Sequence, residues 1–194
     1  MRTLRGISCA CTLSLALVTT PALCAQADTV PAGREAIEAT EGRALSEWDG
    51  RVAQMIRRGD LRLREDEPSE DGTHRNQWYQ QQHKGVRVEG GDVWRETTDG
   101  KTTALEGTVF SGITIDPVPK LTRAEALAAF QALTPDGAGP SLPPELIVLP
   151  RPDGTYVLAY RARIFTSAGA TVYALDASTG AEVSREAEAE VPKN

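Results

Sequence analysis

Cysteine is nearly absent from this chain of 194 residues. Its three cysteines, Cys9, Cys11 and Cys24, all lie among the first 27 residues. We expect that segment to be removed, as explained below, so the mature chain would contain no cysteine. A disulfide framework and a cysteine nucleophile are therefore excluded for the remaining residues.

The common catalytic motifs are also missing. The sequence contains no H-E-x-x-H, no G-x-S-x-G and no phosphate-binding glycine loop. Its two histidines, His74 and His83, are nine residues apart in a strand-like stretch, so we expect their side chains to point to opposite faces. A zinc site would need a further, distant ligand. The sequence thus predicts no catalytic residue, no metal site and no cofactor.

Basic residues are outnumbered by acidic ones. Lys and Arg total 21 and Asp and Glu total 27, which gives a formal net charge of −6. Nucleic-acid binding requires a basic patch, so we expect no nucleic-acid partner. An acidic surface suits a basic protein partner. Many of the acidic residues fall in two runs, Glu65–Asp71 and Glu182–Glu190, which are typical of solvated faces or tails.

Beyond the first 27 residues there is no apolar run long enough to span a membrane. Residues 1–27 resemble a secretory signal peptide, with Arg2 and Arg5 ahead of a short apolar stretch and an A-x-A site ending at Ala27. We therefore predict cleavage after Ala27 and a secreted or periplasmic protein. Lipidation of Cys24 is the alternative, but Leu23 precedes it where a lipobox has Gly or Ala.

The remaining sequence divides into two similar halves. Residues 28–43 are small and polar and are expected to be loosely ordered. Residues 44–58 have the periodicity of an amphipathic helix, which Gly59 would end. Strand patterns follow up to residue 110, and Asp99-Gly100 is typical of a hairpin turn. These features predict a first module over residues 44–117.

The second half repeats the plan over residues 118–186. Thr122 and Glu125 form a capping-box pattern at the start of a helix. Four strand-like stretches follow, and residues 187–194 form an acidic tail. The predicted fold class is α+β, with two helix-plus-antiparallel-sheet modules in tandem.

The first module contains a stretch that resembles the fungalysin/thermolysin propeptide (FTP) motif. It reads T-H-R-N-Q-W-Y-Q-Q-Q-H-K-G-V-R-V-E-G-G, from Thr73 to Gly91. Arg75 directly follows His74, one residue earlier than in the family pattern. The other residues that match the motif are Gln81, Gly85, Val88, Gly90 and Gly91.

The second module is similar to a PepSY domain, which has a cystatin-like fold. The similarity rests on L-T-R-A-E-A-L, beginning at Leu121, and on A-L-D-A-S-T-G-A-E-V, beginning at Ala174. Asp176, Thr179 and Gly180 match the hallmark turn of that domain.

These resemblances imply a function. In thermolysin-family zinc metalloproteases the two modules lie in this order ahead of the catalytic domain, and no catalytic domain precedes Asn194 here. The resemblance implies a non-catalytic secreted protein that inhibits a thermolysin-like zinc metalloprotease or assists its folding, and that is monomeric when free. Two alternatives stay open: a truncated or detached pro-region with no independent role, and a periplasmic PepSY-type module with another partner. An H-E-x-x-H frame downstream would favour the first, and a pull-down without proteases would favour the second.

Two roles are possible for the motif residues. Glycines 85, 90, 91 and 180 suit turns with positive φ, Asp176 suits an Asx-type turn, and Gln81 suits a local hydrogen bond. The alternative is direct contact with the protease. For Glu186, Glu188 and Glu190 we consider contact with a protease cleft, against a solvated tail.

Overall fold

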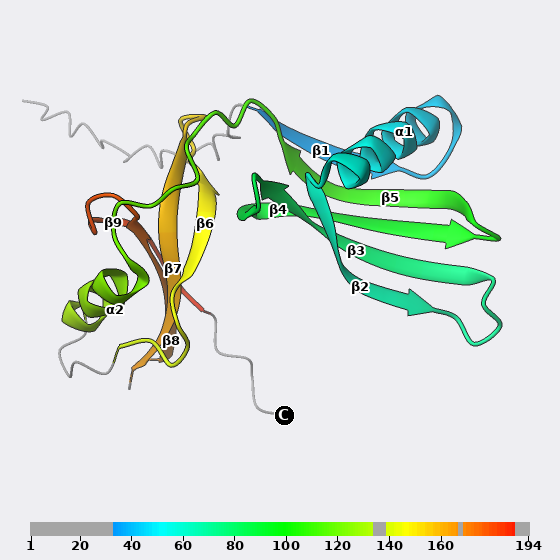
Figure 1. Cartoon of the computed structure of the whole chain (residues 1–194). Helices are drawn as coiled ribbons and strands as arrows, with labels where there is room; N and C mark the ends of the chain where they lie inside the picture. Colours follow the sequence, from blue (N-terminus) through cyan, green and yellow to red (C-terminus); the bar gives the residue numbers. More distant parts are fainter. Residues whose placement is uncertain (1–32, 134–138, 167–168, 189–194) are drawn as a thin grey trace, which may run out of the picture.

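The computed structural model describes residues 33–133, 139–166 and 169–188. The predicted signal peptide, with Cys24 and Ala27, lies outside these ranges. The fold is α+β: two helices pack on one large, curled, mixed sheet of nine strands (Figure 1). The sheet has two arms, each with one helix.

The N-terminal arm contains five strands in the order β2-β3-β4-β5-β1, all antiparallel to their neighbours. Helix α1 covers one face of this arm, because its apolar stripe, centred on the buried Val52, packs on Tyr79, Val93 and Leu105 of the sheet. As predicted, Gly59 ends the helix in the left-handed conformation. The elements are β1 (Arg34–Ala39), α1 (Gly42–Arg58), β2 (Leu61–Pro68), β3 (His74–His83), β4 (Val86–Thr98) and β5 (Lys101–Phe110).

Strand β1 differs from the expectation of a loosely ordered segment over residues 28–43. It pairs with β5 along its whole length and buries Ile37 and Ala39. The local pattern is weak because Ile37 is its only bulky apolar residue. The strand forms because β5 offers an open edge, which the sequence of residues 34–39 does not reveal.

The C-terminal arm is an antiparallel meander, and α2 packs on one of its faces. Phe130 of α2 is fully buried against a core that includes Tyr160, Ile164 and Leu175. The predicted capping box of Thr122 is present. The elements are α2 (Arg123–Ala132), β6 (Glu145–Pro150), β7 (Tyr156–Thr166), β8 (Gly169–Asp176) and β9 (Glu182–Ala187).

The two arms join through one parallel pairing, which the expectation of two antiparallel modules did not include. Arg87 and Val88 of β4 pair with Ile147 and Val148 of β6. A small core forms there around Val88, Phe110 and Val148, and side chains from the strap between β5 and α2, including Ile113 and Ile115, pack against it. The junction therefore makes one continuous sheet out of the two modules.

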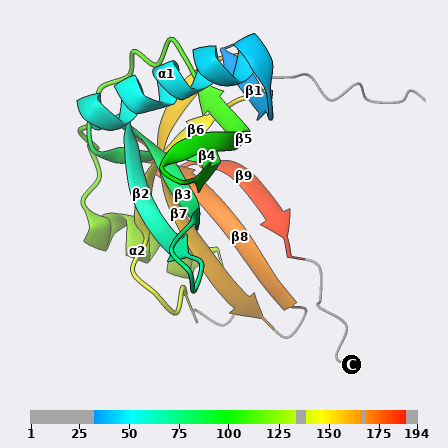
Figure 2. The ribbon, with the colours of Figure 1, turned by 90° about the vertical axis from the view of Figure 1, so that its right-hand side faces the viewer.

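The two helices lie on the outer sides of the bent sheet (Figures 1 and 2). In Figure 1, α1 lies above the N-terminal arm and α2 lies to the left of the C-terminal arm. The helix-free faces of the two arms consequently meet at an inner corner. Neither described helix is long and apolar enough to cross a membrane.

Candidate functional site

The FTP motif builds the junction between the arms. Opposite Gln81, strand β3 is bulged, and residues Val88 to Gly91 of β4 loop away from it. The Gln81 side chain is buried, and its amide donates to the Phe110 carbonyl at 2.7 Å and accepts from the Phe110 N–H at 2.8 Å. Gln81 was expected to make a local hydrogen bond, and this was wrong, because its partner lies 29 residues away.

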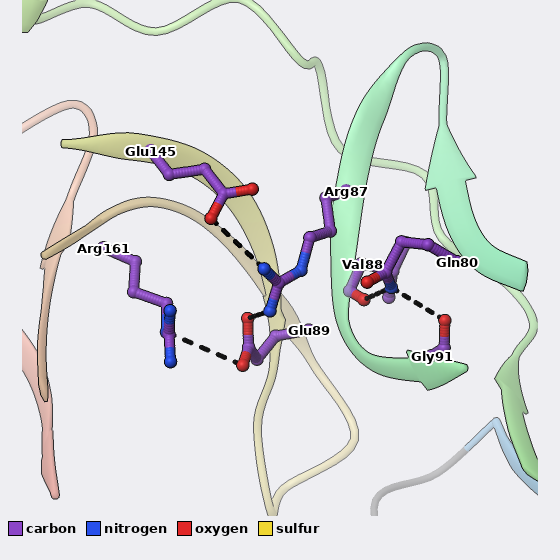
Figure 3. Close-up of polar contacts among 7 residues, drawn as sticks. All are labelled: Gln80, Arg87, Val88, Glu89, Gly91, Glu145 and Arg161. Atoms are coloured by element: carbon purple, nitrogen blue, oxygen red, sulfur yellow. Dashed lines mark hydrogen bonds and ion pairs between the residues drawn. The ribbon is translucent and has the colours of Figure 1, made fainter. Parts of the chain in front are cut away.

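Gln80 holds the same loop from the other side. Its buried side chain donates to the Val88 carbonyl at 2.9 Å and to the Gly91 carbonyl at 2.8 Å (Figure 3). Because the loop is held in this way, the start of β4 is directed towards β6, where Val88 is fully buried.

The motif glycines serve two different needs. Gly85 and Gly90 have positive φ, of 87° and 71°, as expected. Gly91 does not; a Cβ on Gly91 would lie 2.8 Å from the Cβ of Gln81. Gly91 is therefore required by close packing against Gln81, and the expectation of positive φ was wrong for this residue.

His74 and Arg75 lie at the opposite end of β3 from Gln81. The Nδ1 atom of His74 lies 3.0 Å from the Thr98 hydroxyl, and Arg75 forms an exposed ion pair with Asp66 at 3.2 Å. His83 instead lies against the strap, with its Nε2 atom 3.0 Å from the Ile115 carbonyl. The motif residues thus do not converge on one point, and within the described residues no group of three or more His, Cys, Asp or Glu could hold a metal ion.

The PepSY-like turn joins β8 to β9. The Asp176 carboxylate accepts hydrogen bonds from the Ser178 hydroxyl and from the backbone N–H groups of Ser178 and Thr179, the last at 2.9 Å. The predicted Asx-type turn is therefore present, and Gly180 completes it with φ of 75°. These hydrogen bonds, first that from the Ser178 hydroxyl, hold the pKa of Asp176 below its usual value.

This turn also anchors the start of the C-terminal arm. The Ala177 carbonyl accepts from the N–H groups of Lys120 and Leu121, at 3.0 and 2.9 Å. The Tyr160 hydroxyl donates to the Leu121 carbonyl at 2.9 Å. The turn therefore fixes the strap immediately before α2.

A network of four charges lies beside the junction. Arg87 contacts Glu89 at 2.6 Å and Glu145 at 3.2 Å, and Arg161 lies 3.6 Å from Glu89 (Figure 3). Arg87 and Glu89 come from the N-terminal arm, whereas Glu145 and Arg161 come from the C-terminal arm. The network thus links the two arms on the helix-free side.

The acidic residues near the end of the chain are partly held by the sheet. Glu186 lies in β9 and pairs with Val172. Glu188 forms an ion pair with Arg163, and its N–H donates to the Ala170 carbonyl at 2.9 Å. Although the acidic tail was expected to begin at residue 187, the described chain remains tied to β8 through Glu188. Glu190 lies outside the described residues.

Sequence reasoning missed the helix-free face of the N-terminal arm. A hollow of about 710 Å³ lies there, and Trp78 and Trp94, both half-buried, line it together with Glu65 and Glu106. A second hollow, of about 560 Å³, shares Arg64 with the first and extends to Arg87 at the junction. The signal was the alternation along β3 and β4, in which Tyr79 and Val93 face α1 and the tryptophans therefore face away.

The comparisons with known proteins support the first resemblance. Residues 59–109 match the family model described as the Fungalysin/Thermolysin Propeptide Motif. This segment runs from Gly59 through β2, β3 and β4 and most of β5. The motif is a non-catalytic region of such precursors, so the chain is not an enzyme.

The remaining comparisons are weaker. A solved structure, the Bacillus megaterium YpeB C-terminal domain, is similar with 16% sequence identity and a TM-score of 0.43, over 79% of this chain and 69% of that one. None of the curated proteins matches the sequence.

Proposed function

We propose that this chain is a propeptide-like protein that binds a thermolysin-like zinc metalloprotease and inhibits it, assists its folding, or both. The observation that carries the proposal is the match of residues 59–109 to the FTP motif, because that motif is a propeptide motif. The fold adds support. Gln81 and Gly91 of the motif build the junction, so the bend between the two arms depends on them.

The shape of the molecule suits binding to a folded partner. A stable interface buries roughly 1,200–2,000 Å² in total and needs no covalent link between the partners. The two helix-free faces at the inner corner offer a surface that a convex partner can contact (Figure 1). The outer edges of β2 and β9 offer sites for an added strand.

We further propose that residues 44–117 and 118–186 act as an FTP-like and a PepSY-like module of one exported, monomeric protein. The separate cores of the two arms support this division. Export after cleavage at Ala27 is consistent with a propeptide motif of secreted proteases.

A reconstituted assay tests the proposal. The chain is added at rising concentration to an active thermolysin-like protease, and peptide hydrolysis is measured. In parallel, the denatured protease is refolded with and without the chain, and the recovered activity is measured. We expect slower hydrolysis, a higher refolding yield, or both.

Two controls make the result specific. Gel analysis after the assay must recover the chain intact, since a chain that is merely a competing substrate also slows hydrolysis. An unrelated acidic protein of similar size must leave both readouts unchanged. If the chain alters neither hydrolysis nor refolding beyond this control, the proposed function is wrong.

A further inference from the structure

Glutamate and tryptophan side chains form a row across the helix-free face of the N-terminal arm. Glu65 of β2 is directly opposite Trp78 of β3, Trp78 is opposite Trp94 of β4, and Trp94 is opposite Glu106 of β5. Glu106 is in turn opposite Glu38 of β1. Residues directly opposite each other share a face and lie about 4.5–5.5 Å apart. We call these five residues the Glu–Trp row.

The row faces solvent on the side away from α1. The neighbours of the two tryptophans, Tyr79 and Val93, are buried in the core beneath α1, so Trp78 and Trp94 point the other way. Both tryptophans are only half-buried, and they line the 710 Å³ hollow described above. The three glutamates of the row are exposed.

Negative charge around this hollow is not balanced within the described chain. Glu65, Asp92 and Glu106 line it, against the single cation Arg64. Ion pairs form elsewhere in the described residues, but none involves a glutamate of the row. Glu38 and Glu106 are directly opposite each other, and like charges in that position are unfavourable.

We propose that the Glu–Trp row is a docking surface for a basic segment of a protein partner, and that a lysine or arginine side chain of that segment enters the hollow over Trp78 and Trp94. The tryptophan faces attract a cation, and the flanking carboxylates neutralise it. Buried aromatic anchors of this type contribute much of the affinity in protein interfaces. The binding of a cation also removes the repulsion between Glu38 and Glu106. The inference does not depend on the partner being a protease.

Peptide binding tests the charge requirement. Dye-labelled tetra-arginine, tetra-glutamate and tetra-glycine peptides are titrated with the chain, and fluorescence anisotropy is measured at low and at high salt. We expect the arginine peptide alone to bind, and more weakly at high salt because ions screen exposed charges. Equal binding of the glutamate peptide, or no binding of the arginine peptide, would overturn the proposal.

Matched variants test the location. We expect Glu65→Gln and Glu106→Gln each to weaken binding of the arginine peptide about two- to fivefold. Glu70→Gln makes the same change of net charge at an exposed residue between β2 and β3, away from the row, and should leave binding unchanged. If Glu70→Gln weakens binding as much as the other two changes, the attraction is only one of net charge, and the docking surface is refuted.

The aromatic contribution needs its own variant. Trp94→Leu keeps an apolar side chain but removes the ring, and we expect binding to weaken about two- to fivefold. Circular dichroism checks that this variant is folded. If it is not, the two glutamine variants still decide the matter, because they change only exposed side chains. Unchanged binding by a folded Trp94→Leu variant would overturn the role of the ring.

Discussion

The two arms share one plan, a helix on one face of an antiparallel sheet, but their helix-free faces differ. In the C-terminal arm this face has a small apolar core of its own, in which Ile147, Ala159 and Ala174 are buried. In the N-terminal arm the same face presents half-buried tryptophans between exposed glutamates. The C-terminal face is thus largely covered by its own side chains, whereas the N-terminal face is open to a partner.

The difference teaches that the same architecture can serve packing in one arm and contact in the other. The charged residues at the junction contribute to this division, because Glu89 and Arg161 line the same hollow as Ile147 and Ala174. Bending the sheet at β4 therefore brings polar groups of the N-terminal arm over the core of the C-terminal arm.

The largest expected effect tests whether the arms fold as one unit. Phe130→Ala removes a fully buried ring from the C-terminal core, and we expect the free energy of unfolding to fall by about 3–5 kcal/mol. All three tryptophans lie in the N-terminal arm, so their fluorescence reports on that arm alone. Because the sheet is continuous, we expect the fluorescence transition in urea to shift together with the circular dichroism transition.

A matched change in the other arm completes this test. Ile37→Ala empties a buried position in the core beneath α1, at an expected cost of about 2–5 kcal/mol. If Phe130→Ala leaves the fluorescence transition in place and produces a separate early step in circular dichroism, the arms unfold independently and the junction does not couple them.

The second expected effect lies at the junction itself. Gln81→Ala removes both partners of the Phe110 backbone groups and leaves a buried N–H and a buried carbonyl without them. We expect the free energy of unfolding to fall by about 2 kcal/mol, measured by urea denaturation.

The neighbouring Gln82 provides the control. Its side chain is only half-buried, so Gln82→Ala should change stability by less than about 0.5 kcal/mol. Equal losses for the two variants would mean that the amide of Gln81 is not what holds the junction.

Local features of the fold were predictable from the sequence, and long-range ones were not. The capping box of Thr122, the turn at Asp99-Gly100 and the Asx turn of Asp176 each depend on residues within a few positions of one another. Both Asp99 and Gly100 have positive φ, as that hairpin turn requires. Such turns can be read directly from adjacent letters.

Strand β1, the parallel pairing of Arg87 and Val88 with β6, and the partner of Gln81 depend on segments far apart in the chain. A strand periodicity does not say which other strand provides the edge. The candidate surface was missed for a related reason. The motif drew attention to Gln81 and the glycines, whereas the exposed row becomes visible only when the register places Glu65, Trp78, Trp94 and Glu106 side by side.

A third comparison concerns two aspartates with the same role, one in each arm. Asp176 closes the β8–β9 turn, and Asp71 closes the β2–β3 turn with hydrogen bonds from Ser69 and Thr73. Asp176→Ala should lower the free energy of unfolding by about 1 kcal/mol at neutral pH. Because the folded-state pKa of Asp176 is depressed, this contribution is present above the unfolded pKa and is lost as the pH falls through the folded pKa.

The pH dependence of Asp71 can be measured directly. Hydrogen bonds from Ser69, then Thr73, lower the pKa of Asp71 from 3.8 to about 2. We therefore expect its carboxyl resonance in an NMR titration to show a midpoint near 2, and its stabilising effect to disappear between these two pH values. A midpoint near 3.8 would mean that the turn is open in solution.

The smallest expected effect returns to the open face of the N-terminal arm. Glu106→Gln removes the repulsion with Glu38 directly opposite, and we expect the free energy of unfolding to rise by about 0.5 kcal/mol, measured by urea denaturation at low salt. Glu96→Gln on the same face is the control, because its opposite neighbours, Asn76 and Ala104, are uncharged. The gain should vanish at 1 M salt, where charges are screened beyond about 3 Å. A gain of the same size for Glu96→Gln would mean that the whole face, and not the Glu–Trp row, carries the unfavourable charge.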